Sequence, residues 1–326
     1  MLSPIHTALT ILICLLFACP PDPAPGDGPK TRIVPHQEGS TPSTIPFTVI
    51  RNRVIVPVTV NSPRVLKLVL DTGMGFDGIL LYRGNLKDSL GLGKTFEARV
   101  PGAGGGKPST AVVADSMNFQ TGELVHRNQR IIVLQQTPIS SRSTDGVIGY
   151  TMLGHYTLEI DYDEMLITLH EPDSFQADSS WEAIPLTFNK KHLPFLKTSI
   201  VIKDEDPIPM DMYVDFAAGE AVELLERPDM KFTLPEETEE SYLGTGLSGD
   251  IYGKMGRISK LTLGSYELED VVTAFAPAKI RSKQKGADGI LGSDALRRFN
   301  IVFDYAHNSL WIKPNSHFRE PFQEEN

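Results

Sequence analysis

The chain has 326 residues, 40% of them hydrophobic, which is enough for two packed domains of ordinary size. The net charge of -10 at pH 7 argues against a nucleic-acid partner, because phosphate binding draws on positive charge. Both cysteines, Cys14 and Cys19, lie in the first twenty residues, so the rest of the chain can form no internal disulfide.

The N-terminal segment is typical of an export signal. Residues 8–18 (ALTILICLLFA) are apolar but too few to span a bilayer, so residues 1–19 are predicted to be a signal peptide. Residues 16–19 (LFAC) resemble the lipobox of bacterial lipoproteins, in which Cys19 would be lipidated; an ordinary cleaved signal and a misplaced start are the alternatives. We expect an exported protein, anchored to a membrane of a bacterial cell envelope only through this lipid, or otherwise periplasmic or secreted.

Residues 20–44 are rich in Pro, Gly, Ser and Thr and predict a flexible tether. Beyond them, strands are predicted at 47–60, 131–134, 165–169 and 310–312, where Val, Ile and Leu dominate. Short helices are predicted at 151–156 and 293–299, with Thr151 and Ser293 as possible caps of their first turns. The fold class is therefore all-β with short helices.

The second half of the chain repeats the first. Four landmarks recur in the same order: 68–73 (LVLDTG) at 212–217 (MYVDFA), 102–104 at 244–246, 145–149 (DGVIG) at 288–292 (DGILG), and 159–162 at 302–305. The chain is predicted to be a tandem duplication with units at 45–175 and 180–315. Residues 170–180 join the units, and residues 316–326 form a tail.

The chemistry is expected where an apolar strand ends on a carboxylate. Residues 68–70 precede Asp71, and burying this Asp without partners would be costly, so it indicates a hydrogen-bonded or catalytic site. The repeat supplies a second such residue, Asp215, at the same position of the second unit.

These motifs resemble those of the aspartic peptidases of the pepsin and retropepsin superfamily. The resemblance implies two similar acid-protease-type β-barrel lobes with the catalytic cleft between them and one Asp from each lobe. The absence of disulfides and the short lobes look nearer to the bacterial retropepsin-like members. The family pattern places Asp71 and Asp215 as catalytic residues, Thr72, Gly73, Gly149 and Gly292 in and beneath the catalytic loops, and Gly102, Gly104, Gly244 and Gly246 in two flap hairpins over the substrate.

The resemblance also implies the reaction. One carboxylate takes a proton from a water while the other, still protonated, donates to the peptide carbonyl, and close like charges enforce this split. No cofactor and no metal are required, and the His residues show no paired ligand spacing. The expected function is that of an aspartic endopeptidase that acts on a peptide or protein substrate as a monomer.

The second unit departs from the family pattern at Phe216 and Ala217. Phe216 has no hydroxyl to grip the opposite lobe, and Ala217 adds a Cβ where a glycine could adopt positive φ. We therefore expect the interlobe grip to be lost on one side. The alternative function is a weakened or inactive peptide-binding lipoprotein, and a homodimer that pairs two first lobes is a third possibility.

Two other patterns are set aside. Residues 244–249 spell G-x-G-x-x-G, but a hairpin rather than a helix is predicted to follow, so no dinucleotide site is expected. Asp145 and Asp288 each precede a glycine and are interpreted as turn residues without a catalytic role.

Overall fold

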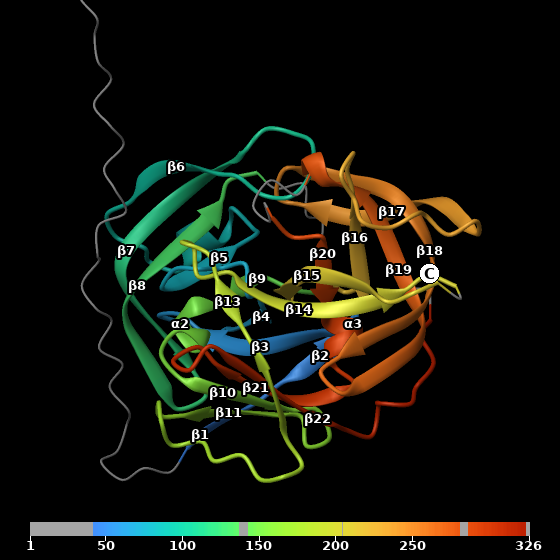
Figure 1. The fold of residues 1–326 in the computed structure, drawn as a ribbon. Helices are drawn as coiled ribbons and strands as arrows, with labels where there is room; N and C mark the ends of the chain where they lie inside the picture. Colours follow the sequence, from blue (N-terminus) through green and yellow to red (C-terminus); the bar gives the residue numbers. More distant parts are fainter. Residues whose placement is uncertain (1–41, 137–142, 204, 281–285, 324–326) are drawn as a thin grey trace, which may run out of the picture. The chain divides into compact units, whose positions relative to one another are not determined.

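The computed structural model describes residues 42–136, 143–203, 205–280 and 286–323, which all belong to one compact unit of the chain (Figure 1). The predicted signal peptide, Cys19, most of the tether and the last three residues of the tail lie outside these ranges. No helix within them is long and apolar enough to cross a membrane.

The first repeat forms an eight-stranded sheet in the order β2-β3-β4-β9-β5-β8-β7-β6. An additional β3–β7 pairing partly closes it into a barrel, and β4–β9 and β5–β8 are parallel. The strands are β2 (Thr48–Ile50), β3 (Arg53–Thr59), β4 (Val65–Leu70), β5 (Gly78–Leu81), β6 (Phe96–Val100), β7 (Ser109–Thr121), β8 (Leu124–Leu134) and β9 (Gly146–Ile148).

The second repeat forms a matching sheet in the order β13-β14-β15-β20-β16-β19-β18-β17. Its parallel pairs, β15–β20 and β16–β19, and its closing pair, β14–β18, occupy the same places as those of the first sheet. The strands are β13 (Thr187–Phe188), β14 (Pro194–Val201), β15 (Ile208–Asp215), β16 (Val222–Glu226), β17 (Thr238–Gly246), β18 (Gly249–Leu263), β19 (Tyr266–Pro277) and β20 (Gly289–Gly292).

A third sheet of six strands is shared by both repeats, in the order β1-β11-β10-β21-β22-β12. The repeats meet where β10 pairs with β21, with Leu158 opposite Phe303 and Ile160 opposite Ile301. The strands are β1 (Ser43–Pro46), β10 (Thr157–Asp161), β11 (Leu166–His170), β12 (Glu182–Pro185), β21 (Phe299–Asp304) and β22 (Ser309–Pro314). The predicted all-β fold class with two lobes is thus confirmed.

Helices are few and one turn long in the described ranges: α1 (Leu86–Ser89), α2 (Tyr150–Leu153), α3 (Ser293–Leu296) and the 3₁₀ turn η1 (Ala278–Ile280). The predicted caps are wrong, because Gly149 and Gly292 occupy the N-cap positions without a side-chain bond. The Thr151 hydroxyl instead accepts from the Gly78 N–H at 2.7 Å, and the Ser293 hydroxyl donates to the Phe216 carbonyl at 2.7 Å. Both hydroxyls therefore fasten the helices to neighbouring loops.

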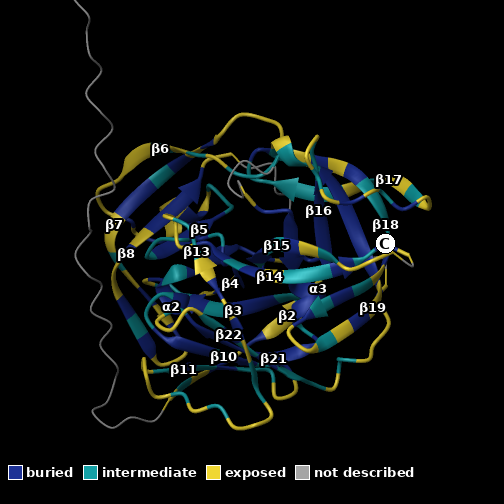
Figure 2. Ribbon diagram, viewed as in Figure 1, coloured by how far each residue is buried: buried dark blue, intermediate teal, exposed yellow. Residues whose placement is uncertain are grey.

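The buried side chains follow the central strands, and β5, β9 and β20 are buried along their whole length (Figure 2). One large apolar cluster runs through both lobes and the shared sheet. Two smaller clusters, one around Val69 and one around Tyr213, lie on the sides of the sheets that carry the residues described below. The tail packs on the second lobe, where the Phe322 ring lies 3.5 Å from the buried Arg298 guanidinium.

Candidate active site

Asp71 and Asp215 stand at equivalent places in the two sheets. Asp71 follows β4, whose last residue, Leu70, pairs with Ile148, and Asp215 ends β15, where it pairs with Gly292. Because each strand is flanked by partners on both sides, the backbone that carries each carboxylate is fixed. Both residues line one cavity between the lobes.

The two loops that carry these carboxylates, residues 71–75 and 215–219, have the same local geometry. The Gly73 N–H donates to the Asp71 Oδ1 at 2.6 Å, and the Ala217 N–H donates to the Asp215 Oδ1 at 2.9 Å. Neither Gly73 nor Ala217 has a positive φ. The expectation that the Cβ of Ala217 conflicts with the conformation of its loop is therefore wrong. Gly73 is needed for space instead: a Cβ there would lie 2.8 Å from the Asp71 Oδ1 and 3.0 Å from the Tyr213 hydroxyl oxygen.

Thr72 joins the two loops across the lobe boundary. Its buried hydroxyl donates to the Val214 carbonyl at 2.7 Å and accepts from the Phe216 N–H at 3.3 Å. Both contacts reach backbone groups on either side of Asp215. One side chain of the first lobe therefore fixes the spacing between the strands that lead to Asp71 and Asp215.

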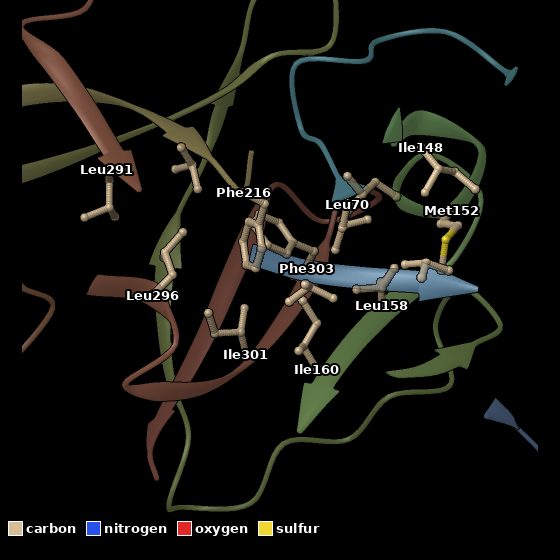
Figure 3. Close-up of a cluster of buried hydrophobic side chains, with 14 of the residues drawn as sticks. Leu70, Ile148, Met152, Leu158, Ile160, Phe216, Leu291, Leu296, Ile301 and Phe303 are labelled. Carbon is tan, nitrogen blue, oxygen red and sulfur yellow. The ribbon is translucent and has the colours of Figure 1, made fainter. Parts of the chain in front are cut away.

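Phe216 makes no such bond and points the other way, into the core between the lobes (Figure 3). It is fully buried, and its ring meets that of Phe303 edge-on at 5.2 Å between centroids. Where the first loop makes a polar contact across the lobe boundary, the second loop thus buries an apolar ring beneath Asp71 and Asp215.

Two turns supply interlobe hydrogen bonds in place of the one that the Phe216 side chain cannot make. Arg53 Nε of the first lobe donates to the Ala217 carbonyl at 2.6 Å, and Asn52 Nδ2 donates to the Gly219 carbonyl at 3.1 Å. In the opposite direction, His192 Nδ1 of the second lobe lies 3.2 Å from the Gly75 carbonyl oxygen. The hydroxyl bond that Phe216 cannot make is therefore absent, as expected, but other residues hold the same loops across the lobe boundary, and nothing in the motifs pointed to these turns.

The support beneath each loop depends on close backbone approach. A Cβ on Gly149 would lie 2.1 Å from the Asp71 carbonyl oxygen, and a Cβ on Gly292 would lie 2.1 Å from the Glu220 carbonyl oxygen. Any larger residue at position 149 or 292 would displace the loop that it supports.

Asp145 and Asp288 support the site more directly than a turn residue would. The Asp145 carboxylate accepts from the Lys67 N–H and the Asp288 carboxylate from the Asp211 N–H, both at 2.9 Å. Lys67 lies on the strand that leads to Asp71 and Asp211 on the strand that leads to Asp215, so each carboxylate ties its supporting segment to one of these strands. The repeat of these residues was the signal that could have revealed this role.

The two glycine-rich hairpin tips meet over the cavity. The Gly106 N–H donates to the Ser248 carbonyl at 2.7 Å, and the Ser248 N–H donates to the Ala103 carbonyl at 2.8 Å. Gly104 and Gly244 have φ of +108° and +127°, and Cβ atoms on Gly102 and Gly246 would collide with Leu247 and Ala103. Both predicted flaps are thus hairpin tips in mutual contact.

The cavity beneath these tips has a volume of about 210 Å³ and draws residues from both lobes. Its lining includes Arg53, Asp71, Gly73, Tyr82, Gly102, Ala103, Val147, Leu193, Tyr213, Asp215, Ala217, Ala218, Glu220, Leu243, Gly244, Thr245, Gly246, Leu247 and Ile251. Within the described ranges, no group of three or more His, Cys, Asp or Glu side chains could hold a metal ion.

Two tyrosines give the cavity its electrostatic character. Burial, followed by the negative charge of Asp71, raises the pKa of Tyr82, while the cation of Arg53 opposes the rise. Burial and the charges of Asp215 and Asp71 raise the pKa of Tyr213. Both phenols therefore keep their protons throughout the acid and neutral range and can only donate to a neighbouring carboxylate.

Comparison with solved structures identifies the crystal structure of an aspartic proteinase from Irpex lacteus as similar. The alignment covers 86% of this chain and 99% of that chain, with a TM-score of 0.51 and 14% sequence identity. No protein-family model and no curated protein matches. The chain thus has the fold of a pepsin-like aspartic proteinase.

Proposed function

We propose that the protein is an aspartic endopeptidase in which Asp71 and Asp215 activate a water. The observation that carries the proposal is the matched pair of catalytic loops, which place one carboxylate from each lobe in a single cavity. The Asp-Phe-Ala sequence of the second loop keeps the backbone bond to its carboxylate. The pair therefore has the parts that the reaction requires.

The proposed reaction needs only these two groups. The ionised carboxylate of the pair accepts a proton from the water, whose oxygen attacks the peptide carbonyl carbon, while the protonated carboxyl donates to the carbonyl oxygen. The tetrahedral gem-diol intermediate then collapses: one of its hydroxyls returns a proton to the pair while the pair protonates the amide nitrogen, the C–N bond breaks, and the pair again holds one shared proton. The two ionisations belong to the pair as a whole.

An extended peptide is the proposed substrate. The cavity lies beneath two hairpins, and extended chains pair readily with strand edges through backbone hydrogen bonds. Because the hairpin tips are bonded to each other through Ser248, they must separate before a continuous chain can enter. This arrangement favours an unfolded segment over a folded surface as substrate.

The test is cleavage of a mixed peptide library by the purified full-length chain across acid to neutral pH. Asp71→Asn and Asp215→Asn are each expected to lower the rate by at least about 100-fold, since each removes a proton-transfer group. Glu220→Gln is the matched control, because it neutralises another carboxylate that lines the same cavity. Substantial cleavage by pure, folded Asp71→Asn would contradict the proposal.

A peptide-binding protein without activity is the second candidate, and the Phe216–Ala217 pair is the observation that favours it. It predicts that a labelled peptide from the library raises fluorescence anisotropy while no product forms at any pH. Circular dichroism would show whether the inactive protein is folded. Cleavage that depends on both Asp residues excludes this candidate.

We also propose that the protein acts as a monomer outside the cytoplasm, held by a lipid on Cys19. The apolar residues 8–18 and the LFAC sequence support the anchor. Cys19→Ala is expected to move the protein from the membrane fraction to the soluble fraction of expressing bacteria. An unchanged distribution would contradict lipidation, and light scattering would test the monomer.

A further inference from the structure

Tyr213 is a feature of the cavity that the proposed reaction does not use. It lies on β15, two residues before Asp215, and is fully buried, with its ring 5.7 Å from that of Phe195. Its hydroxyl has no hydrogen-bond partner among the residues that the structure describes. Because buried hydroxyls are nearly always bonded, this one calls for a functional explanation.

The hydroxyl faces the first catalytic loop. The Tyr213 hydroxyl oxygen and the Asp71 Oδ1 border the same small space, since both lie within about the contact distance of a Cβ placed on Gly73. The Thr72 hydroxyl is also close to the Tyr213 hydroxyl and lowers the pKa of Tyr213. It directs its proton to the Val214 carbonyl, however, and the two hydroxyls do not reach hydrogen-bond geometry. The Tyr213 proton is therefore available to the carboxylate pair.

The first lobe has no counterpart to this hydroxyl. Two residues before Asp71 stands Val69, which belongs to the apolar cluster on which Ala217 packs. The phenol at the equivalent position of the second lobe thus makes the carboxylate pair asymmetric. Val69 is smaller than Tyr213 and leaves space for the Cβ of Ala217. The Tyr213 hydroxyl, by contrast, leaves room only for glycine at position 73.

The charged and titratable groups that line the cavity with Tyr213 come from several elements. They are Arg53 on β3, Asp71 after β4, Tyr82 after β5, Asp215 at the end of β15 and Glu220 before β16. The charge of Asp215 affects Tyr213 most, and that of Asp71 comes next. Both carboxylates are therefore near enough to gain from a fixed donor.

We propose that Tyr213 is a positioning residue whose hydroxyl, which is unpartnered among the described residues, donates a hydrogen bond to the carboxylate pair once the pair carries its single negative charge, and so stabilises that charge. The inference rests on the proposed peptidase function and adds a third proton-bearing group to the site. A hydrogen bond to the charged form favours ionisation. The pair therefore loses its first proton at a lower pH than it would without Tyr213. The phenol itself keeps its proton throughout.

Tyr213→Phe tests the inference in the full-length chain. Loss of a hydrogen bond to a charged group should move the acid limb of the pH profile of kcat/KM upward by about one pH unit and lower kcat more than it changes KM. Deletion of an unpartnered hydroxyl should leave urea stability unchanged or raised. A role confined to packing predicts the same stability but no change in the pH profile.

Tyr305→Phe is the matched control. The Tyr305 hydroxyl is likewise buried without a partner in the described ranges and senses the charge of Asp71, but it lines a separate cavity with Tyr150 and His192. This variant should keep the wild-type pH profile. An equal shift in both variants would overturn the specific role of Tyr213.

A readout without turnover separates this inference from the proposed function. In carbon-13 NMR of aspartate-labelled protein, with Asp71→Asn and Asp215→Asn to assign the signals, Tyr213→Phe should raise the first ionisation of the pair by about one unit. An unchanged titration would overturn the role of Tyr213, even if wild-type cleavage is lost in Asp71→Asn. A shifted titration in a protein that never cleaves would uphold that role and refute the peptidase.

Discussion

The Asp-bearing loops of the two lobes, residues 71–75 and 215–219, reach one geometry by different means. In the first, Thr72 bonds across to the second lobe; in the second, Phe216 is buried against Phe303 and does not. Both loops nevertheless bond their carboxylates to the N–H two residues later. The difference teaches that the surrounding backbone, and not the full tripeptide motif, holds each of these carboxylates in place.

The reciprocal turns explain how one hydroxyl could be lost. Asn52 contacts the Gly219 carbonyl and His192 contacts the Gly75 carbonyl, and these two carbonyls occupy equivalent positions of the loops. With Arg53 on the neighbouring Ala217 carbonyl, the second loop has two donors from the opposite lobe. Variants that equalise the lobes can break or sharpen this comparison, beginning with the largest expected effect.

Phe216→Thr would copy Thr72 of the first loop and is expected to be the most damaging change. Phe216 is fully buried, so its removal should leave a cavity and lower the free energy of unfolding by about 4 kcal/mol. Urea denaturation measures this loss, and Phe216→Leu serves as a milder control. A stable Phe216→Thr protein with raised activity would show instead that the missing hydroxyl limits the site.

Asp288→Asn should cost more stability than Asp145→Asn. Asp288 is buried and paired with both Arg227 and Lys231, whereas the Arg64 and Arg83 nitrogens lie 3.8 and 3.4 Å from the Asp145 Oδ1. Removal of the Asp288 carboxylate takes a close partner from two cations, although Asp229 stays 3.1 Å from Arg227 and Asp211 stays 4.0 Å from Lys231, so we expect losses of about 2 and about 1 kcal/mol. Equal losses in urea denaturation would refute the claim that the second support is the more tightly held.

His126 makes the first lobe the acid-sensitive one. Burial lowers its pKa from 6.5 to about 3, and the equivalent cross-strand pair of the second lobe is Leu261–Leu268 in place of Phe119–His126. The unfolded chain binds the proton first, so this contribution to stability is complete above about pH 6.5 and falls as pH drops toward 3, by up to about 3 kcal/mol at pH 4.

His126→Leu copies the second lobe and should flatten this dependence. The measurement is urea denaturation at pH 7 and pH 4, with wild type and variant side by side. The difference in unfolding free energy between the two pH values should shrink in the variant. An identical acid loss in both proteins would place the sensitive group elsewhere.

Exchange of the third loop residue should have the smallest effect on stability. Ala217→Gly should cost about 1 kcal/mol, mainly by loosening the unfolded chain, and leave activity within about twofold.

Gly73→Ala must displace the Asp71 carboxylate or the Tyr213 ring, so cleavage should fall at least about tenfold while the melting temperature changes little. A fully active Gly73→Ala protein would show that the first loop can accommodate a Cβ at this position.

The Val-, Ile- and Leu-rich segments predicted the all-β class, and the repeat predicted that Asp71 and Asp215 stand at equal points of two similar units. The two lobes, with one Asp from each in a shared cleft, followed from the family resemblance. The role of Thr72 followed from family resemblance. The contacts of Arg53, Asn52 and His192 could not be predicted, because they join turns to carbonyl groups of the other lobe and leave no pattern in the sequence. The capping error at Thr151 and Ser293 has the same cause: tertiary partners took the hydroxyls.

The pairing of β10 with β21 has a consequence for how the site assembles. The strands that join the two lobes belong to one covalent chain, so each lobe meets its partner at an effective concentration set by the linking segment and not by the amount of protein present. The cavity that holds Asp71 and Asp215 therefore forms in a first-order step. Dilution, which separates subunits that build a shared site by association, cannot take this one apart.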